Sequence, residues 1–446
     1  MKNILVIISL MIMLAGGCTQ RTAEGIHPQW IRNAVIYEVN TRQITPEGTF
    51  NAFAGMLPGL KELGVDVLWF MPIYPIGMEG RKGTLGSYYS IRDYGAVNPE
   101  FGTMEDFRHL VDKAHQLGMK VILDWVAAHT SRDAVWLDQE DWYIRRPGGE
   151  PEFLYDWSDV ARLNYGNQQM RRAMLEKMLF WLDKVNVDGF RCDMADLTPV
   201  DFWNWAVPVL KQHKPDIFML AESENPVNTQ KAFNAYYAWR FHHTMNSVAR
   251  GEKSADSLRK DLNDMNSEFG PHAIPMLFTS NHDENSWSGT EFERMGDAAL
   301  QMAAFTFVLP GIPLIYTGQE VGNTKRLEFF EKDTLQPSDN LYYTQFYKRL
   351  IAFKKNTDAL QVPPYGGVLK ERPHTGPSSV FAFTRETPNN RVLALFNFAD
   401  QPVSFRLTGK QADGTYIDWK DQTLYNVTSE HTWEMEPHGF RILTLQ

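Results

Sequence analysis

Residues 170–193, MRRAMLEKMLFWLDKVNVDGFRCD, contain a helix, a strand and a charged strand end in that order, and this arrangement decides the fold. Apolar residues between positions 170 and 185 recur with the spacing of one helical face. The short run at residues 187–190 is typical of a buried strand. Arg191 and Asp193 follow it, so charged side chains stand directly at the end of a buried strand.

The same pattern recurs through the first three-quarters of the chain. Near-continuous apolar strands that alternate with helical segments indicate a parallel sheet covered on both faces. A weaker candidate at residues 235–239 would make eight strands, which favours a closed (β/α)8 TIM barrel over an open sheet. No glycine-rich phosphate loop follows any strand, which argues against an open nucleotide-binding sheet. The clear runs are residues 34–37, 65–70, 121–123, 187–190, 217–220, 274–278 and 313–316.

The sequence predicts two additions to a barrel that spans residues 31–360. A polar, tryptophan-rich stretch at residues 130–167 separates the third strand from the fourth and is interpreted as a small excursion subdomain. After residue 360 the pattern changes to alternating apolar and polar residues, which predicts a C-terminal antiparallel β-sandwich over residues 361–446. Its clearest strands are residues 380–384, 392–396, 403–407 and 440–445.

The composition excludes several classes of protein. The chain has 446 residues, of which 43% are hydrophobic, and this is enough for two to three packed domains. The 54 acidic side chains outnumber the 44 basic ones, which argues against nucleic-acid binding because phosphate contacts need clustered Lys and Arg. Two cysteines, Cys18 and Cys192, are too few for a disulfide scaffold or a four-cysteine zinc site.

Residues 1–17 have the pattern of an export signal. Lys2 precedes an apolar run at residues 4–14 that is short for a membrane span but suits a secretory signal. Residues 15–18, AGGC, resemble a bacterial lipoprotein cleavage box, in which Cys18 is lipidated; a plain cleaved signal peptide is the alternative. We therefore expect a tether at residues 18–30 and a lipid-anchored protein of the bacterial cell envelope. Its location is either the periplasmic face or the cell surface.

Charged residues cluster at the predicted strand ends, where a (β/α)8 barrel carries its active site. Any one of them could instead cap a helix or form a structural ion pair, but their repetition at strand ends favours one shared site. The set is Asp124 and His129 after the third strand, Arg191 and Asp193 after the fourth, Glu222 after the fifth, and His282 and Asp283 after the seventh.

Two carboxyl groups on one rim suit glycoside cleavage, in which one attacks the anomeric carbon and the other protonates the leaving oxygen. Retaining enzymes hold such a pair about 5 to 5.5 Å apart, and neighbouring strands lie about 4.8 Å apart. Asp193 and Glu222 follow neighbouring strands and are the predicted pair. Arg191 is expected beside Asp193 alone, where its charge would separate the pKa values of the two carboxyl groups.

A metal-dependent hydrolase is an alternative from a different class. Its ligands would be Asp124, His129, His282 and Asp283. Metal-binding barrels usually carry a tight His-x-His cluster or an equivalent, and the sequence has none.

The motifs resemble those of the α-amylase superfamily, glycoside hydrolase family 13, across nearly the whole mature chain. Residues 64–75, GVDVLWFMPIYP, are similar to the family's second-strand segment, and residues 311–320, GIPLIYTGQE, to its eighth-strand signature. Residues 88–103 are similar to the loop whose tyrosine stacks on the sugar at the cleavage site. The resemblance assigns that role to Tyr89.

The resemblance also implies a role for each rim residue and no redox or organic cofactor. Asp193 matches the nucleophile that forms a covalent glycosyl-enzyme, and Glu222 matches the general acid/base. Asp283 matches the carboxylate that holds sugar hydroxyls and favours ring distortion. The remaining matches are His129 and His282 to the hydroxyl-binding histidines, Arg191 to the arginine beside the nucleophile, and Asp124 to the aspartate that supports the site.

Two departures from the family pattern fall at its calcium site. Ala128 stands where the family usually has an asparagine ligand, and Arg162 stands where it has an aspartate ligand. The loss of an oxygen ligand and the gain of a cation should abolish a hard-cation site. We therefore predict that no metal binds there and that the Arg162 guanidinium partly replaces the charge of the ion.

Residues 194–197, MADL, replace the Ala-Ala-Lys-His of many α-1,4-acting relatives, whose last two residues contact the leaving-group sugars. We expect retaining hydrolysis of α-glucans or maltooligosaccharides, with an α-glucan transglycosylase or an α-1,6-glucosidase as alternatives. A non-catalytic glycan-binding lipoprotein is a further alternative, against which the intact Asp193, Glu222 and Asp283 argue. Linkage, chain length, endo or exo action and oligomeric state stay open.

Four tryptophans crowd the region after the third predicted strand: Trp125, Trp136, Trp142 and Trp157. Glucose rings stack well on indole rings, but most tryptophans in a chain of this size fill the core. We expect one or two of the four to line the cleft.

Overall fold

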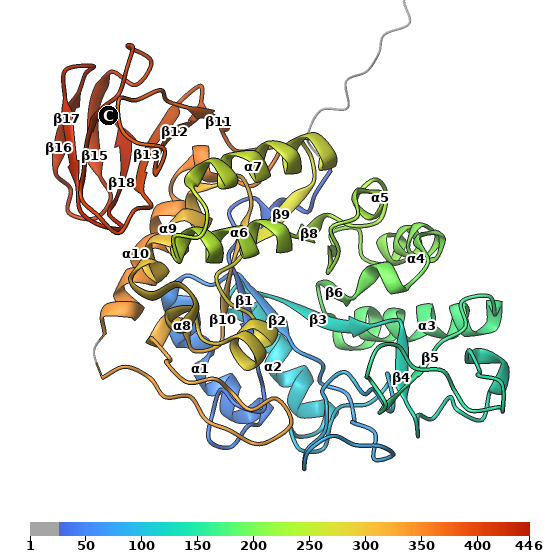
Figure 1. Ribbon diagram of the computed structural model, residues 1–446. Helices are drawn as coiled ribbons and strands as arrows, with labels where there is room; N and C mark the ends of the chain where they lie inside the picture. The colour runs from blue at the N-terminus through green and yellow to red at the C-terminus, as the bar shows by residue number, and fades with distance from the viewer. Residues whose placement is uncertain (1–25, 340) are drawn as a thin grey trace, which may run out of the picture.

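The computed structural model describes residues 26–339 and 341–446, and its centre is a closed barrel of eight parallel strands (Figure 1). The strands pair in the order β1-β10-β9-β8-β7-β6-β3-β2. All seven clear strands and the weaker eighth candidate are present, so the predicted (β/α)8 barrel is confirmed. The strands are β1 (Ile36–Val39), β2 (Val67–Phe70), β3 (Lys120–Val126), β6 (Gly189–Asp193), β7 (Phe218–Ala221), β8 (Ala235–Tyr237), β9 (Ile274–Leu277) and β10 (Ile312–Tyr316).

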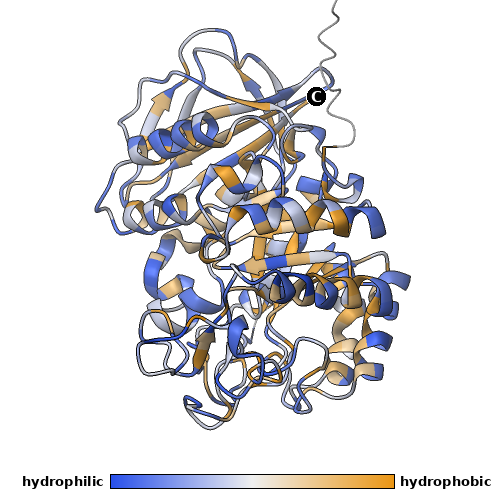
Figure 2. Ribbon diagram, turned by 90° about the vertical axis from the view of Figure 1, so that its right-hand side faces the viewer, coloured by the Kyte–Doolittle hydropathy of each residue, from blue (hydrophilic) through white to orange (hydrophobic). Residues whose placement is uncertain are grey.

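The barrel strands are buried on both faces, which explains why they read as continuous apolar runs. Ile36 of β1 and Ile122 of β3 belong to one apolar cluster inside the barrel, while the residues beside them pack with the surrounding helices. Figure 2 shows the central strands coloured mainly as hydrophobic. Two positions further along, Glu38 and Asp124 continue the inward-facing rows, so the interior becomes charged towards the carboxyl ends of the strands.

Helices cover the outside of the barrel, and several of their ends are marked in the sequence. Thr103 starts α2 with a capping box, because its hydroxyl accepts from the Asp106 amide and the Asp106 carboxylate accepts from the Thr103 amide. Gly64 ends α1 in a left-handed conformation, φ 106°. The helices are α1 (Phe50–Leu63), α2 (Met104–Gln116), α3 (Gln168–Phe180), α4 (Val200–His213), α5 (Pro226–Thr229), α6 (Trp239–Ala249), α7 (Ala255–Phe269), α8 (Glu291–Met295), α9 (Ala299–Val308) and α10 (Tyr342–Lys355).

Between β3 and α3 the chain leaves the barrel as a small excursion, at the opposite side of Figure 1 from the C-terminal strands. Its two short strands, β4 (His129–Ser131) and β5 (Val160–Arg162), pair antiparallel, with His129 opposite Arg162. Because β4 begins soon after β3 ends, a sheet rather than a loop fixes the backbone of His129 next to the barrel rim.

The C-terminal strands form two sheets that pack as a sandwich, as predicted. Phe405 and Trp433 of the two-stranded sheet β14-β17 share a core with Leu393 of the six-stranded sheet β11-β12-β13-β18-β15-β16. The other face of the larger sheet meets the barrel, where Phe305 of α9 contacts Phe396 at 4.9 Å between ring centroids. The strands are β11 (Val368–Glu371), β12 (Val380–Thr387), β13 (Asn390–Asn397), β14 (Val403–Arg406), β15 (Gly414–Asp418), β16 (Leu424–Val427), β17 (Thr432–Met435) and β18 (Phe440–Leu445).

The predicted signal peptide at residues 1–17 and the lipid attachment point Cys18 lie outside the described residues. Residues 26–30, which were assigned to the tether, pack on the barrel. His27 is buried, with its Nε2 2.7 Å from the His272 carbonyl oxygen and its Nδ1 3.1 Å from the Asn234 amide nitrogen. Within the described residues, no helix is both long and apolar enough to cross a membrane.

Candidate active site

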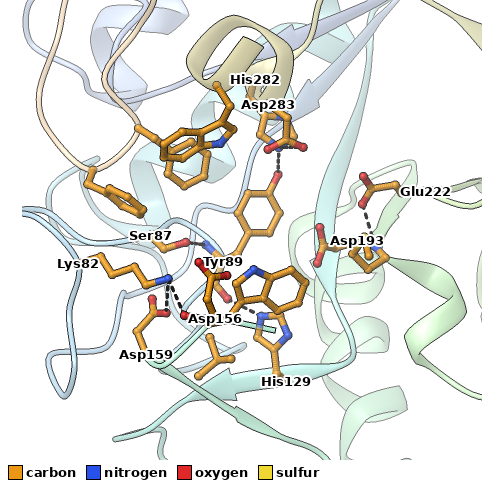
Figure 3. A pocket seen from close by; sticks show the side chains of 16 residues that line it. Lys82, Ser87, Tyr89, His129, Asp156, Asp159, Asp193, Glu222, His282 and Asp283 are labelled. Atoms are coloured by element: carbon orange, nitrogen blue, oxygen red, sulfur yellow. Dashed lines mark hydrogen bonds and ion pairs between the residues drawn. The ribbon is translucent and has the colours of Figure 1, made fainter. Parts of the chain in front are cut away.

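A cavity of about 600 Å³ opens at the carboxyl ends of the barrel strands (Figure 3), and this volume is typical of a small-ligand site. Two further predicted site residues, Arg191 and Asp124, are fully buried and contact the residues that line it. The predicted site residues that line the cavity itself are Tyr89, His129, Asp193, Glu222, His282 and Asp283. The structure therefore brings the whole predicted set together.

Arg191 contacts three carboxylates at the centre of this site. Its Nη1 donates to Asp193 Oδ1 at 2.9 Å and to Asp124 Oδ1 at 3.0 Å, and its Nη2 lies 2.8 Å from Glu222 Oε2. The prediction that Arg191 stands beside Asp193 alone is therefore wrong. The strands β3, β6 and β7 are neighbours, and a planar guanidinium with donors on two edges reaches the carboxylates of both adjoining strands.

The two predicted reacting carboxyl groups are distinguished by their hydrogen bonds. Burial raises the pKa of both Asp193 and Glu222, and the Arg191 charge opposes that rise. Asp193 accepts a hydrogen bond from Arg191, whereas Glu222 Oε2 accepts one from the Met194 amide at 2.9 Å. The charge of Asp193 raises the pKa of Glu222 further. Because like charges at one site disfavour each other, the pair favours an ionised Asp193 and a protonated Glu222.

The close approach of β6 and β7 depends on Gly189. A Cβ at this position would lie 1.9 Å from the Phe218 carbonyl oxygen, so a larger residue would push the strands apart. At the other end of the pair, the Glu222 amide donates to the Cys192 carbonyl at 3.0 Å. The backbone therefore places the Asp193 and Glu222 side chains next to each other.

Tyr89 and the two histidines line the same cavity as Asp193 and Glu222, with Tyr89 between His282 and His129 in the view of Figure 3. The Tyr89 hydroxyl lies 2.7 Å from His282 Nε2 and 3.1 Å from Asp124 Oδ2. Burial lowers the pKa of His129 to about 4, so its ring is neutral at physiological pH. His129 Nε2 lies 3.2 Å from the Tyr89 carbonyl oxygen, to which it donates, and this contact ties the excursion to the Tyr89 loop.

Comparison with known proteins decides the family. The family model described as "Alpha amylase, catalytic domain" matches residues 31–349, and the model described as "Maltogenic Amylase, C-terminal domain" matches residues 373–442. The chain belongs to the α-amylase family of glycoside hydrolases. This membership excludes the metal-dependent hydrolase alternative.

Relatives within the family cover most of the chain. An α-amylase of Haloarcula japonica is 29% identical over 87% of this chain, which spans only 58% of that longer protein. The structure of a noncanonic maltogenic α-amylase from Thermotoga neapolitana superposes with a TM-score of 0.85 at 27% identity, covering 93% of this chain and 99% of that one. An α-amylase structure from Lactobacillus plantarum gives a TM-score of 0.82 at 28% identity, covering 94% and 100% of the two chains.

One of the four tryptophans considered from the sequence lines the cavity of this family member, as expected. It is Trp157, whose ring lies 5.6 Å from that of His129. Trp125 is fully buried, and Trp136 and Trp142 pack against each other at 5.3 Å.

Sequence reasoning missed an aromatic wall and a buried acid. Trp287, Phe329 and Phe330 line the cavity with mutual ring distances of 5.2 to 5.7 Å. The two phenylalanines come from an irregular segment after β10, where no periodic pattern marks them. Glu38 contacts His282 from β1. A charged residue inside an otherwise apolar strand was a visible signal for it. Lys82, which pairs with Asp159 at 3.6 Å, was also missed.

The residues at the family's calcium position do not fit a calcium ion. Ala128 has no side-chain oxygen, and its carbonyl accepts a hydrogen bond from the Leu163 amide at 3.0 Å. Arg162 of β5 pairs in register with His129 of β4, and its guanidinium forms an ion pair with Glu152 at 3.3 Å. The Arg162 guanidinium therefore occupies the position of a calcium ligand and already has a carboxylate partner. Because a calcium ion needs several oxygen ligands, these residues do not provide a site for one.

Within the described part of the chain, one cluster has the spacing of metal ligands: His242, His243 and Glu284. Arg294 Nη1 lies 3.5 Å from Glu284 Oε2 and 3.5 Å from His242 Nε2. The guanidinium therefore already supplies a positive charge to this group, and we assign the cluster a structural role.

Proposed function

We propose that this enzyme hydrolyses α-glucosidic bonds in α-glucans or maltooligosaccharides with retention of configuration. Asp193 is the nucleophile, and Glu222 is the general acid/base. The observation that carries the proposal is the placement of these two carboxyl groups on adjacent strands, both in contact with the buried Arg191. The likeness to proteins named α-amylases supports the substrate class.

In the first step, Asp193 attacks the anomeric carbon while Glu222 gives its proton to the leaving glycosidic oxygen. Arg191 holds Asp193 through Oδ1, which leaves Oδ2 as the attacking oxygen. The glycosidic bond breaks, and an ester forms between the sugar and Asp193. Glu222 becomes ionised, and the Arg191 guanidinium and the Met194 amide next to its Oε2 stabilise that charge.

In the second step, the ionised Glu222 takes a proton from a water molecule, which attacks the same carbon and releases Asp193. Two inversions give net retention. Asp283, His282, His129 and Tyr89 line the same cavity and are assigned to hold the hydroxyl groups and the ring of the sugar that reacts. His129 Nδ1 has no hydrogen-bond partner among the residues that the structure describes, which leaves it as an acceptor for a substrate hydroxyl.

One experiment tests this proposal against its alternatives: the protein is incubated with maltoheptaose and, separately, with isomaltooligosaccharides, and NMR follows the products and their anomeric form. We expect maltoheptaose to be cleaved with initial release of the α-anomer. Cleavage confined to isomaltooligosaccharides would instead identify an α-1,6-glucosidase, and products longer than the substrate a transglycosylase. Initial release of the β-anomer would contradict retention, and no cleavage of either substrate would support the glycan-binding alternative.

Trp287 is assigned to a sugar unit beyond the cleavage site. It follows Asp283 by four residues, its side chain is 57% exposed, and its ring lies 5.3 Å from that of Phe329 at the cavity wall. Exposed indole rings stack on the apolar faces of glucose units. We expect Trp287→Ala to lower kcat/KM for maltoheptaose about threefold to tenfold, mainly through KM, with a smaller change for maltotriose.

Trp205→Ala is the matched control for this prediction, because Trp205 is 39% exposed on α4 and does not line the cavity. This substitution should leave kcat/KM unchanged for both maltoheptaose and maltotriose. An equal loss on maltoheptaose and maltotriose in Trp287→Ala would contradict a role in binding the longer chain.

We propose that the enzyme works without calcium at the family's usual position. The carbonyl of Ala128 is already bonded, and Arg162 pairs with Glu152. Incubation with EDTA is therefore expected to leave both the Tm and the activity on maltoheptaose unchanged. A bound ion present at 100 times its Kd would contribute about 2.7 kcal/mol to stability. A fall of Tm in EDTA that added calcium reverses would refute the proposal.

We propose that Cys18 carries a lipid anchor at the bacterial cell envelope, on the basis of its cleavage-box pattern. Eight residues lie between Cys18 and His27, a span of about 30 Å at full extension. His27 is fixed beside His272, just before the start of β9 and so at the end of the barrel opposite the cavity. This anchor would leave the cleft facing away from the membrane. Cys18→Ser should move the protein from the membrane fraction to the soluble fraction, and an unchanged distribution would contradict lipidation.

A further inference from the structure

Glu38 is a fully buried carboxyl group in the otherwise apolar strand β1. It stands in register with Trp69 of β2 and Tyr316 of β10 and continues the inward row of Ile36. A buried carboxylate costs free energy unless a partner meets its charge. Its Oε1 lies 2.5 Å from His282 Nδ1, while its Oε2 has no hydrogen-bond partner in residues 26–339 and 341–446. The fold therefore places an acid beneath His282.

The hydrogen bonds around His282 account for both protons of its ring. The Tyr89 hydroxyl has one proton, and it donates that proton to Asp124 Oδ2, 3.1 Å away. The same hydroxyl lies 2.7 Å from His282 Nε2, so it accepts there from an Nε2–H group. His282 Nδ1 faces Glu38, whose pKa burial raises and His282 lowers, and which can only accept when it is ionised. With Glu38 ionised and the Tyr89 hydroxyl directed to Asp124, both ring nitrogens carry hydrogen.

This chain of bonds continues to the reacting carboxyl groups. Asp124 accepts from Tyr89 and from Arg191, and Arg191 contacts both Asp193 and Glu222. The direction of the Tyr89 hydroxyl is the one link that can reverse, because a hydroxyl can donate or accept. If His282 lost its Nε2 proton, the hydroxyl would turn to donate to that nitrogen and would leave Asp124 with one donor fewer.

We propose that Glu38 is a positioning residue that holds His282 as an imidazolium, which in turn fixes the Tyr89 hydroxyl towards Asp124. Glu38 does not touch the substrate cavity and acts through His282. The effect on turnover rests on the proposed glycosidase function, whereas the charge of His282 does not.

The groups that face His282 come from several elements. They are Glu38 of β1, Tyr89 of the segment after β2, Arg191 of β6 and the adjacent Asp283, whose Oδ2 lies 3.4 Å from Nε2. Burial works against the charged ring, but Asp283 and Glu38 raise the pKa of His282 to about 9. The imidazolium is therefore present below about pH 9 and is lost as pH rises through that value.

Glu38→Gln keeps the shape of the side chain and removes its charge. Without that anion the pKa of His282 falls from about 9, so at pH 8 a larger share of the protein has a neutral ring, and in that share Tyr89 turns away from Asp124. We expect kcat at pH 8 to fall about threefold to tenfold, the range in which a fall of the pKa to between about 7.5 and 7 leaves the ring charged in the remaining fraction, with KM little changed. At pH 5 the solution protonates the ring, so the ratio of the wild-type kcat to the variant kcat should shrink to within about twofold. Glu38→Asp retains the charge and should recover part of the activity at pH 8.

Asp188→Asn is the matched control, because it removes the carboxylate of another buried carboxylate–His pair, with His115 Nε2 at 2.7 Å, outside the cavity. It should leave the shape of the pH profile unchanged. A ratio of wild-type to Glu38→Gln kcat that stays constant from pH 5 to pH 8, in a variant with an unchanged Tm, would show a merely structural role and overturn the proposal.

A direct measurement needs neither a substrate nor the Glu38 variant. In wild-type protein with ¹⁵N-labelled histidine, NMR reports the protonation of each ring nitrogen, and His282→Asn assigns the His282 signals. We expect both nitrogens of His282 to be protonated at pH 7.5. A neutral ring at that pH, with the proton on Glu38 instead, would overturn the proposal. Because no substrate is involved, this outcome is distinct from a failure of the glycosidase assignment.

Discussion

Asp193→Asn is expected to abolish turnover, with a loss in kcat of at least about 10,000-fold. An amide oxygen is a much weaker nucleophile than a carboxylate, so no ester with the sugar forms. The fold should survive, because the new amide oxygen can still accept from Arg191 Nη1, which now lies 2.9 Å from Asp193 Oδ1. Initial rates on maltoheptaose and the Tm together check both parts of this expectation.

Asp201→Asn provides the control for this change. Asp201 lies in the first turn of α4, is exposed, and pairs with Arg171 at 2.8 Å, outside the cavity. It should keep the wild-type rate. Activity of Asp193→Asn within a factor of about ten of the wild type would show that another group attacks the sugar.

Glu222→Gln should separate substrates by their leaving groups. A sugar leaving group needs a proton, so the loss on maltoheptaose should reach about 100-fold to 10,000-fold. Fluoride leaves without protonation, so α-maltosyl fluoride should still react with Asp193 in the first step. The second step then lacks its base, and a rapid burst of fluoride followed by slow turnover is expected. The glutamine oxygen can still accept from the Met194 amide, so the local backbone should be kept.

Glu224→Gln is the matched control for this prediction, because Glu224 stands two residues on and accepts from the Arg240 amide at 3.0 Å, outside the cavity. Equal losses on maltoheptaose and α-maltosyl fluoride in Glu222→Gln would argue against a role in proton transfer, since both substrates would then depend on Glu222 in the same way.

The barrel could be predicted because strands that are buried on both faces consist of consecutive apolar residues in the sequence. Strand β8 was the weak candidate because it has only three residues, Ala235–Tyr237. In the C-terminal domain, β11, β15, β16 and β17 were missed because each of these short segments buries two side chains or fewer, such as Val427 and Trp433. Their positions are set by pairing with other strands, for example β17 with β14, which a local pattern does not record.

The site residues that stand at strand ends could be predicted from the order of the strands. Contacts that a long side chain makes across the barrel could not be predicted in this way. Strand ends located Asp193 and Glu222 and placed them on neighbouring strands. The sequence did not show that Arg191 contacts both, because the span of a long side chain inside a barrel depends on its three-dimensional surroundings. Phe329 comes from an irregular segment, and only folding brings it to 5.3 Å from Trp287.

The central claim, that Asp193 attacks the sugar, is tested most directly by mass spectrometry of the trapped intermediate. Glu222→Gln is mixed with α-maltosyl fluoride, quenched in acid and digested. We predict that the peptide containing Asp193 gains the mass of one maltosyl group and loses it in mild base, as an ester does. A maltosyl group on Asp283, or a burst of fluoride without any labelled peptide, would contradict the assignment.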